Sequence, residues 1–208
     1  MVCSGKGGTG KSTVSVLLGA CLARLSRKVL LIELDSGLRS VDIIAGVYGR
    51  TVYDIEDVLC GRCEGAKAVV PSPLYPGLSV ISAPYEGGAV EAAPLGRLLV
   101  AMRPYFDYVI LDTAPVGMVT DTLLIGRVAD LSVYVCRADY TRKAEFTLIN
   151  ELMENNKLPN LCIAINGLDL QKKKYGYYYG YGKYGKYYGY GKRYGYGYGE
   201  KHTSREGI

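Results

Sequence analysis

The stretch GKGGTGKS, Gly5 to Ser12, fits the pattern G-x-x-x-x-G-K-[ST] and lies between a short apolar run and a helix-length segment. Glycines let backbone N–H groups curl around phosphate groups, the Lys11 ammonium reaches the terminal phosphate oxygens, and the Ser12 hydroxyl ligates Mg²⁺. The stretch therefore predicts a strand, a loop and a helix that bind ATP and Mg²⁺. The loop residues expected to contact the nucleotide are Gly5, Lys6, Gly7, Gly8, Thr9, Gly10, Lys11, Ser12 and Thr13.

The chain up to Asn166 alternates short apolar runs with helix-length segments. The runs are rich in β-branched residues without internal polar alternation, which is typical of strands buried on both faces of a sheet. We therefore predict a doubly wound α/β domain with a mostly parallel sheet of the P-loop NTPase type, whose ligand lies beyond the carboxyl ends of the strands. The expected strands are MVC, KVLLIEL, GLSVIS, DYVILD, LSVYVC and LCIAIN, and the expected helices span 12–25, 41–47, 54–59, 94–102 and 143–156.

The first expected strand is short. Only Met1–Cys3 form the apolar run before the loop, where a strand of about five residues is usual. Two explanations stay open: the sequence is a piece of a longer chain, or its first strand is weakly anchored.

A different composition begins after the last apolar run. The segment KKKYGYYYGYGKYGKYYGYGKRYGYGYG, Lys172–Gly199, holds twelve tyrosines among glycine and lysine and has too few aliphatic residues to build a core. Residues 172–208 carry 9 Lys+Arg against 2 Asp+Glu (net +7), whereas residues 1–171 carry 16 against 18 (net −2). We predict an ATP-binding domain over 1–171 and a disordered, flexible tail over 172–208.

Cysteine and hydropathy patterns narrow the class of protein. Six cysteines without a signal peptide favour a reducing cytosol and free thiols. The sequence contains no run of eighteen apolar residues, so it predicts no membrane span. Cys60 and Cys63 form a lone C-x-x-C without a second pair, which does not favour zinc.

Acidic residues follow two of the apolar runs: Glu33 and Asp35 in VLLIELD, and Asp112 in YVILD. Parallel strands end at one edge of a sheet, where the Mg²⁺ of a bound nucleotide needs negative charge. The alternative is that a strand-end acid caps the next helix. We expect these acids at the phosphates.

Other polar residues have two open interpretations. Asn166 follows the last run, where its amide can pair with an adenine edge or simply form a turn. Arg39, Arg137 and Arg142 are candidates for phosphate contacts, although solvated surface arginines are more common.

Two related families resemble different parts of the chain. Residues 1–103 resemble the MinD/ParA group of deviant Walker ATPases in SGKGGTGKST, which contains that group's extra lysine (here Lys6), and in LLIELDSGLRSVDIIAGV and VYDIEDVLCGRC. Residues 104–199 resemble the bacterial tyrosine kinases (BY-kinases) of capsule and exopolysaccharide export in FDYVILDTAPVGMVTDTLLIGRVADLSVYVCRADYTRK, NELMENNKLPNLCIAINGLDL and the tyrosine cluster.

The kinase resemblance implies a role for each matching residue. Lys11 and Ser12 would hold the phosphates and Mg²⁺, Asp35 and Asp112 would be the acids on the metal side, and Glu33 would stand where that family has a base-like aspartate. The tyrosine cluster would be autophosphorylated, usually by a neighbouring subunit. The implied phosphoacceptors are Tyr175, Tyr177, Tyr178, Tyr179, Tyr181, Tyr184, Tyr187, Tyr188, Tyr190, Tyr194, Tyr196 and Tyr198.

The resemblance also implies partners and a location. We expect an autophosphorylating tyrosine kinase that self-associates as a ring or dimer and serves exopolysaccharide synthesis at the inner face of the cell membrane, through a membrane-anchored activator. The kinases' ring-forming segment upstream of the loop has no counterpart here, Glu33 is one methylene longer than aspartate, and Lys6 belongs to the MinD pattern. The alternative is therefore a MinD/ParA-type ATPase that acts as a dimerisation and positioning switch. A basic aromatic tail can also stack on single-stranded nucleic acid, but we expect no direct nucleic-acid partner.

Overall fold

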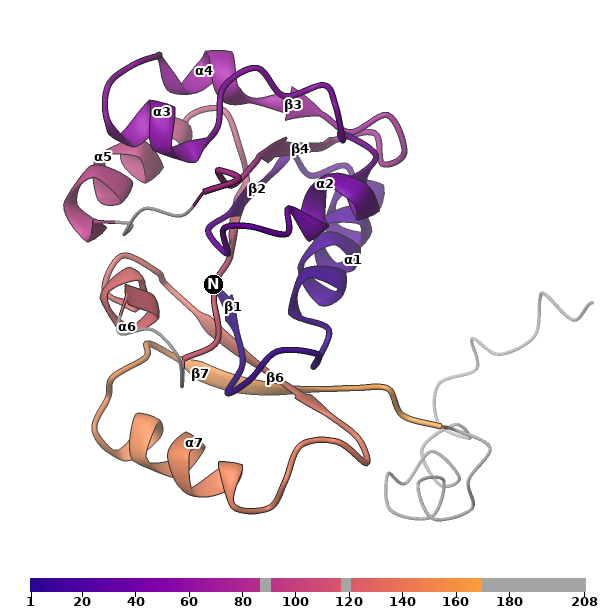
Figure 1. The fold of residues 1–208 in the computed structure, drawn as a ribbon, viewed down its shortest axis with the longest axis vertical. Helices are drawn as coiled ribbons and strands as arrows, with labels where there is room; N and C mark the ends of the chain where they lie inside the picture. Colours follow the sequence, from indigo (N-terminus) through magenta and orange to yellow (C-terminus); the bar gives the residue numbers. More distant parts are fainter. Residues whose placement is uncertain (87–90, 117–120, 170–208) are drawn as a thin grey trace, which may run out of the picture. The chain divides into compact units, whose positions relative to one another are not determined.

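The computed structural model describes residues 1–86, 91–116 and 121–169. Residues Met1–Gly167 form a compact unit around a seven-stranded sheet of order β3-β4-β2-β5-β1-β6-β7 (Figure 1). Neighbouring strands are parallel except for the edge pair β3 and β4. The predicted doubly wound α/β fold is thus confirmed, and the tyrosines Tyr175–Tyr198 lie outside the described residues.

The elements follow the chain in a largely alternating order. The strands are β1 (Val2–Cys3), β2 (Val29–Glu33), β3 (Val70–Pro71), β4 (Leu78–Ile81), β5 (Tyr108–Asp112), β6 (Ser132–Arg137) and β7 (Leu161–Asn166). The helices are α1 (Lys11–Arg24), α2 (Ser40–Ala45), α3 (Ile55–Leu59), α4 (Gly65–Ala68), α5 (Ala92–Met102), α6 (Asp121–Gly126) and α7 (Glu145–Glu154).

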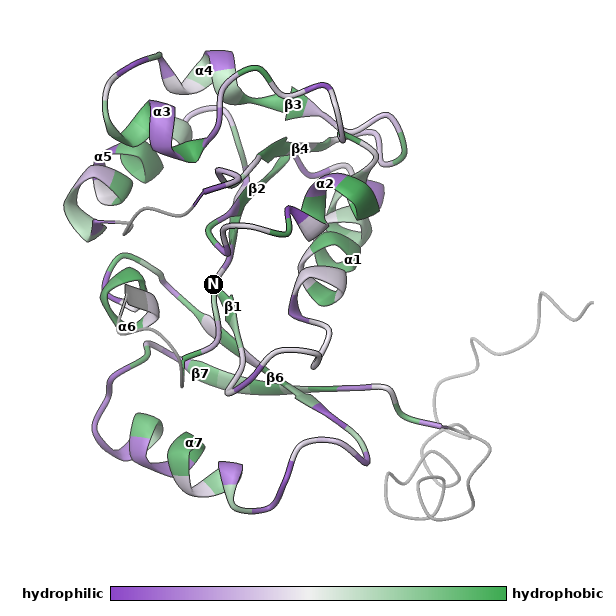
Figure 2. Ribbon diagram, in the orientation of Figure 1, coloured by the Kyte–Doolittle hydropathy of each residue, from purple (hydrophilic) through white to green (hydrophobic). Residues whose placement is uncertain are grey.

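Strand β2 is buried along its whole length and supplies both layers of the core. Leu30 and Ile32 pack toward α3 and α5, while Val29 and Leu31 pack toward α1 and α2. Burying a side chain of this size stabilises the fold by about 1.5–3 kcal/mol. Figure 2 shows the strands as mostly hydrophobic, which fits a sheet covered on both faces.

Three short elements were not predicted from the sequence. Helix α4 has four residues and β3 has two, so neither is long enough to show a period, and β3 contains Pro71, which is tolerated at a sheet edge. Helix α6 has six residues within a segment whose sequence carries no regular apolar stripe.

The central strand β1 is as short as the sequence indicates. It pairs with both neighbours, through Val2 with Asp112 of β5 and with Val133 of β6. The buried amino group of Met1 donates a hydrogen bond of 2.6 Å to the Leu131 carbonyl, and burial lowers its pKa. Among the helices of the described residues, none has the length and apolarity required for a membrane span.

Candidate nucleotide-binding site

The glycine loop leads from β1 into α1 at the carboxyl edge of the sheet. Gly8 and Gly10 have φ values of 76° and 91°, which glycine adopts without steric cost. Helix α1 has no side-chain cap and no acidic residue in its first turn, so neither a side-chain acceptor nor a negative charge competes for its first N–H groups. Such a helix start attracts phosphate through these N–H groups and the helix dipole.

The Lys11 side chain is buried and reaches toward the end of β2. Its Nζ lies 3.3 Å from Asp35 Oδ2, and the Asp35 side chain is 36% exposed. Asp35 partly balances the charge of Lys11. Because its side chain also remains open to solvent, this carboxylate is accessible beside the loop.

Asp112 ends β5 and is fully buried beside β1. Its Oδ1 accepts a hydrogen bond of 2.8 Å from Ser15, and Oδ2 has no hydrogen-bond partner among the described residues. Burial raises the pKa of the Asp112 carboxyl, while the hydroxyls of Ser12 and Ser15 and the Lys11 charge act in the opposite direction.

This donor set fits a nucleotide-bound Mg²⁺. A buried carboxylate oxygen without a partner stands near the Ser12 hydroxyl, and Mg²⁺ in such sites takes most of its other ligands from phosphates and water. No group of three or more His, Cys, Asp or Glu side chains gathers in the described part of the chain, as an all-protein metal cage would need. Ser12 and Asp112 are therefore the residues that would hold the ion, and the expected contact of Asp35 with the ion stays a prediction.

Glu33 is buried next to Asp112 rather than facing the loop. Its Oε1 accepts a hydrogen bond of 3.1 Å from the backbone N–H of Val41 in α2. Burial raises the pKa of Glu33 to about 8, and the nearby charges of Asp112 and Asp42 act in the same direction. This contact is the helix-capping alternative, and the role of Glu33 as a base stays a prediction that requires the carboxyl to lose its proton.

Asn166 meets the phosphate loop itself. Its Nδ2 donates a hydrogen bond of 3.0 Å to the Thr9 carbonyl, and its Oδ1 accepts from the Gly167 N–H. The side-chain amide is therefore engaged with backbone in this structure, and adenine pairing by Asn166 stays a prediction. The contact brings the last strand to the first loop.

The three candidate arginines differ in their contacts. Arg137 Nη1 donates a hydrogen bond of 3.0 Å to the Gly8 carbonyl. Arg39 is instead buried, with Nε 2.8 Å from Asp42 Oδ2 and its guanidinium stacked on Tyr85. Arg142 is exposed. Of these three arginines, only Arg137 shows a side-chain hydrogen bond to the loop in the described residues.

Sequence reasoning missed Tyr140 and Glu145. The Tyr140 hydroxyl donates a hydrogen bond of 3.1 Å to the Gly7 carbonyl, and Lys6 lies 2.8 Å from Glu145 Oε1. Tyr140 follows β6 in an irregular segment and Glu145 is the first residue of α7, and no motif in the sequence marks either residue. Their role depends on the loop after β6 folding over the glycine loop.

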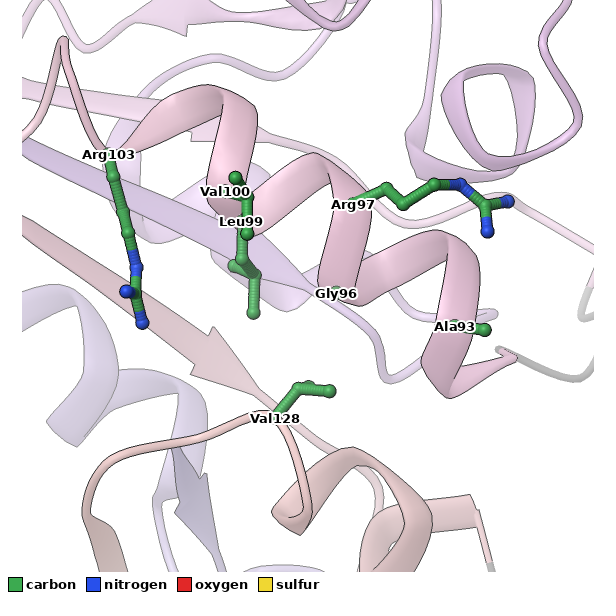
Figure 3. Close-up of a pocket in the computed structure, with 7 residues that line it drawn as sticks. All are labelled: Ala93, Gly96, Arg97, Leu99, Val100, Arg103 and Val128. Atoms are coloured by element: carbon green, nitrogen blue, oxygen red, sulfur yellow. The ribbon is translucent and has the colours of Figure 1, made fainter.

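Features away from the loop add nothing to this site. All six cysteines are free, as expected. A cavity of about 540 Å³ lies between α5 and Val128, but its Arg97 and Arg103 extend in different directions and do not converge on one ligand (Figure 3).

Known proteins resemble this chain in sequence and in fold. Residues 1–171 match the CobQ/CobB/MinD/ParA nucleotide binding domain. The septum site-determining protein MinD of Synechocystis sp. is 32% identical over 170 residues, which are 81% of this chain and 64% of that protein. A chain of the MinC:MinD cell division protein complex of Aquifex aeolicus is 29% identical with a TM-score of 0.73, over 84% of this chain and 71% of that one. The kinase domain of the Escherichia coli tyrosine kinase ETK is 25% identical with a TM-score of 0.67, over 81% and 66%.

The matches fix the family and leave the individual activity open. The chain spans less than two thirds of the Synechocystis MinD, and solved structures of both MinD proteins and a tyrosine kinase domain share its fold. The family match covers the glycine loop, both strand-end acid positions and Asn166. The chain therefore belongs to the CobQ/CobB/MinD/ParA family of nucleotide-binding domains.

Proposed function

We propose that this protein is an ATP- and Mg²⁺-dependent protein-tyrosine kinase that autophosphorylates its C-terminal tyrosine cluster. The observation that carries the proposal is the hydrogen bond from Asn166 to Thr9, because it holds the carboxyl end of β7 at the phosphate loop. The first tyrosine of the cluster, Tyr175, follows Asn166 by nine residues. Nine residues reach at most about 30 Å when fully extended, a length that would allow delivery of a phenol to a nearby phosphate.

The chemistry needs an acceptor in line and charge neutralisation. Lys11 and the start of α1 would bind the β- and γ-phosphates, and Ser12 with Asp112 would hold Mg²⁺, which neutralises phosphate charge when bound. A tyrosine oxygen would attack the γ-phosphorus, the bond to the ADP oxygen would break, and the phenol proton would pass to a carboxylate. Asp35 suits this role because it is partly exposed beside Lys11, whereas Glu33 is buried.

The tail's composition supports this substrate. Its glycines let an extended backbone approach an active site closely, and its net charge of +7 draws it toward bound nucleotide. We further propose the domain partition at 171/172, self-association, and action at the inner membrane face through an activator of polysaccharide export, in line with the kinase resemblance of residues 104–199.

A MinD/ParA-type ATPase switch is the second candidate function. Lys6 and the identity to MinD proteins favour it. Water would then replace the tyrosine as acceptor at the same loop, and the nucleotide-dependent dimer would position other components.

One experiment distinguishes the kinase from the ATPase switch. The protein is incubated with labelled ATP and Mg²⁺, and the label is then mapped by mass spectrometry. We expect label on Tyr175–Tyr198 that disappears in Lys11→Met. Lys157→Met, which removes an exposed lysine, should label as the unaltered protein does. Phosphate release without any labelled tyrosine would reject the kinase and favour the switch.

A further inference from the structure

Tyr140 makes several contacts with the phosphate loop and with residues that bind it. Its hydroxyl donates to the Gly7 carbonyl at 3.1 Å, and its own carbonyl accepts a hydrogen bond of 3.1 Å from Lys6 Nζ. The Lys6 ammonium lies 4.2 Å from the ring centroid, and the Arg137 guanidinium lies 5.5 Å from it. The ring therefore lies near two cations: the ammonium of Lys6, which belongs to the loop, and the guanidinium of Arg137, which binds the loop.

Three successive loop carbonyls are held by side chains from β6 and β7 and the segment after β6. Tyr140 binds the carbonyl of Gly7, Arg137 binds that of Gly8 at 3.0 Å, and Asn166 binds that of Thr9 at 3.0 Å. These donors lie about 130 to 160 residues away in the chain, so the contacts exist only through the folded sheet.

Holding a carbonyl also fixes an N–H group. A trans peptide unit is planar, so its N–H points opposite to its C=O. Fixing the carbonyls of Gly7 and Gly8 therefore fixes the N–H groups of Gly8 and Thr9, away from the clamping side chains. Without these contacts the glycine backbone would keep wide conformational freedom. The N–H groups that bind phosphate would then have to be ordered when the nucleotide binds.

The glycines are needed for this close approach. A Cβ on Gly8 would lie 3.1 Å from the Tyr140 hydroxyl, and one on Gly10 would collide with Asn166 Nδ2. At Gly7 a Cβ would meet no atom within 4 Å. At Gly8 and Gly10 the atoms that a Cβ would meet thus belong to two of the clamping side chains.

We propose that Tyr140 and Arg137 are positioning residues that preorganise the N–H groups of Gly8 and Thr9 for the phosphates of a nucleotide. Neither is a catalytic residue, because each acts through the loop backbone. The inference rests on nucleotide binding within the proposed function and does not depend on the kinase step.

The test is calorimetric binding of Mg²⁺·ADP and of Mg²⁺·tripolyphosphate, which lacks the adenosine part. Tyr140→Phe keeps the ring and removes one hydrogen bond, so we expect dissociation constants about 3- to 10-fold higher for both ligands. Arg137→Met should weaken both by a similar factor. Tyr105→Phe, at a tyrosine that is 66% exposed, is the matched control and should bind as the unaltered protein does.

Several results distinguish positioning from a merely structural role. The unfolding midpoint without ligand should be unchanged in Tyr140→Phe, and the double variant should lose less than the product of the two single factors, because Tyr140 and Arg137 share one cluster. Unchanged binding in Tyr140→Phe, or a loss for ADP without a loss for tripolyphosphate, would overturn the proposal. If the unaltered protein binds ADP but labels no tyrosine, the kinase function fails while the positioning role stands.

Discussion

Lys6 Nζ lies 2.8 Å from Glu145 Oε1 within one chain. The same ammonium donates to the Tyr140 carbonyl and lies over its ring, so it has three contacts in its own chain. Burial alone would raise the pKa of Glu145. Hydrogen bonds from Lys6 and from the Arg142 N–H outweigh this effect and keep that pKa below its usual value. In the MinD/ParA-type alternative this extra lysine would reach across a nucleotide-bound dimer, and Lys6 would have to leave these contacts to do so.

Glu145→Gln is expected to favour nucleotide-dependent dimers. Removing the carboxylate weakens the contact that holds Lys6, and a partly exposed ion pair of this kind contributes about 0.2–1 kcal/mol. We expect the dimer dissociation constant with ATP and Mg²⁺ to fall by about 1.4- to 5-fold in analytical ultracentrifugation. Glu151→Gln, an exposed change on the same helix α7, is the control. Weaker dimers in Glu145→Gln would contradict a restraining role for the pair.

Glu33 makes stability fall as pH rises. The folded protein keeps its proton up to about pH 8, whereas the unfolded chain releases it near the ordinary value of 4.5. Between these values the native state binds more protons, so the free energy of unfolding decreases with pH by at most about 1.4 kcal/mol per unit. Glu33→Gln should flatten this slope, measured by urea unfolding at about pH 5.5 and about pH 7.5. An identical slope in Glu33→Gln and in the exposed control Glu154→Gln would contradict the burial argument.

Gly10 and Gly7 should differ sharply when changed to alanine. Gly10 has a φ of 91°, and a Cβ there would collide with Asn166, so Gly10→Ala should cost at least about 1–2 kcal/mol of stability. Gly7→Ala has open space and serves as the control. Thermal unfolding without nucleotide measures both. Equal losses would mean that the contact between Asn166 and the loop is not formed in solution.

The buried pair of Arg39 and Asp42 should contribute more to the free energy of unfolding than the exposed pair of Arg62 and Asp57. Both side chains are almost fully buried, and Asp42 also accepts a hydrogen bond from Ser82. Arg39→Met leaves a buried carboxylate without its cation and should cost about 3–5 kcal/mol in urea unfolding. Arg62→Met, which opens an exposed pair with Asp57, should cost far less, because water screens that pair. Similar costs for the two variants would show that Arg39 is solvated.

Under the proposed kinase function, phosphorylation of the tail should disperse assemblies of the protein. Each phosphotyrosine adds a charge of about −1.5 to −2, so roughly four or five of them cancel the net charge of +7 on residues 172–208. We expect the unphosphorylated protein to associate more strongly than the phosphorylated or tail-deleted forms in light scattering. Equal association of all three forms would reject this charge switch.

The sequence by itself determined the fold class and predicted the glycine loop of the candidate site. The glycine loop has a fixed spacing, and the strands are continuous apolar runs, so both are visible without any long-range information. The expected strands at KVLLIEL, DYVILD and LSVYVC are β2, β5 and β6 in the structure.

The tertiary structure alone decided which side chains act on the loop. Asn166 meets Thr9, Tyr140 meets Gly7 and Lys6 meets Glu145 because β6 and β7 lie beside β1 in the sheet. These partners are far apart in the sequence, and strand order and register bring them together. Local propensity and spacing carry no information about such contacts. The contact of Glu33 with the Val41 N–H of α2 is local instead, and the sequence had left it open as the helix-capping alternative.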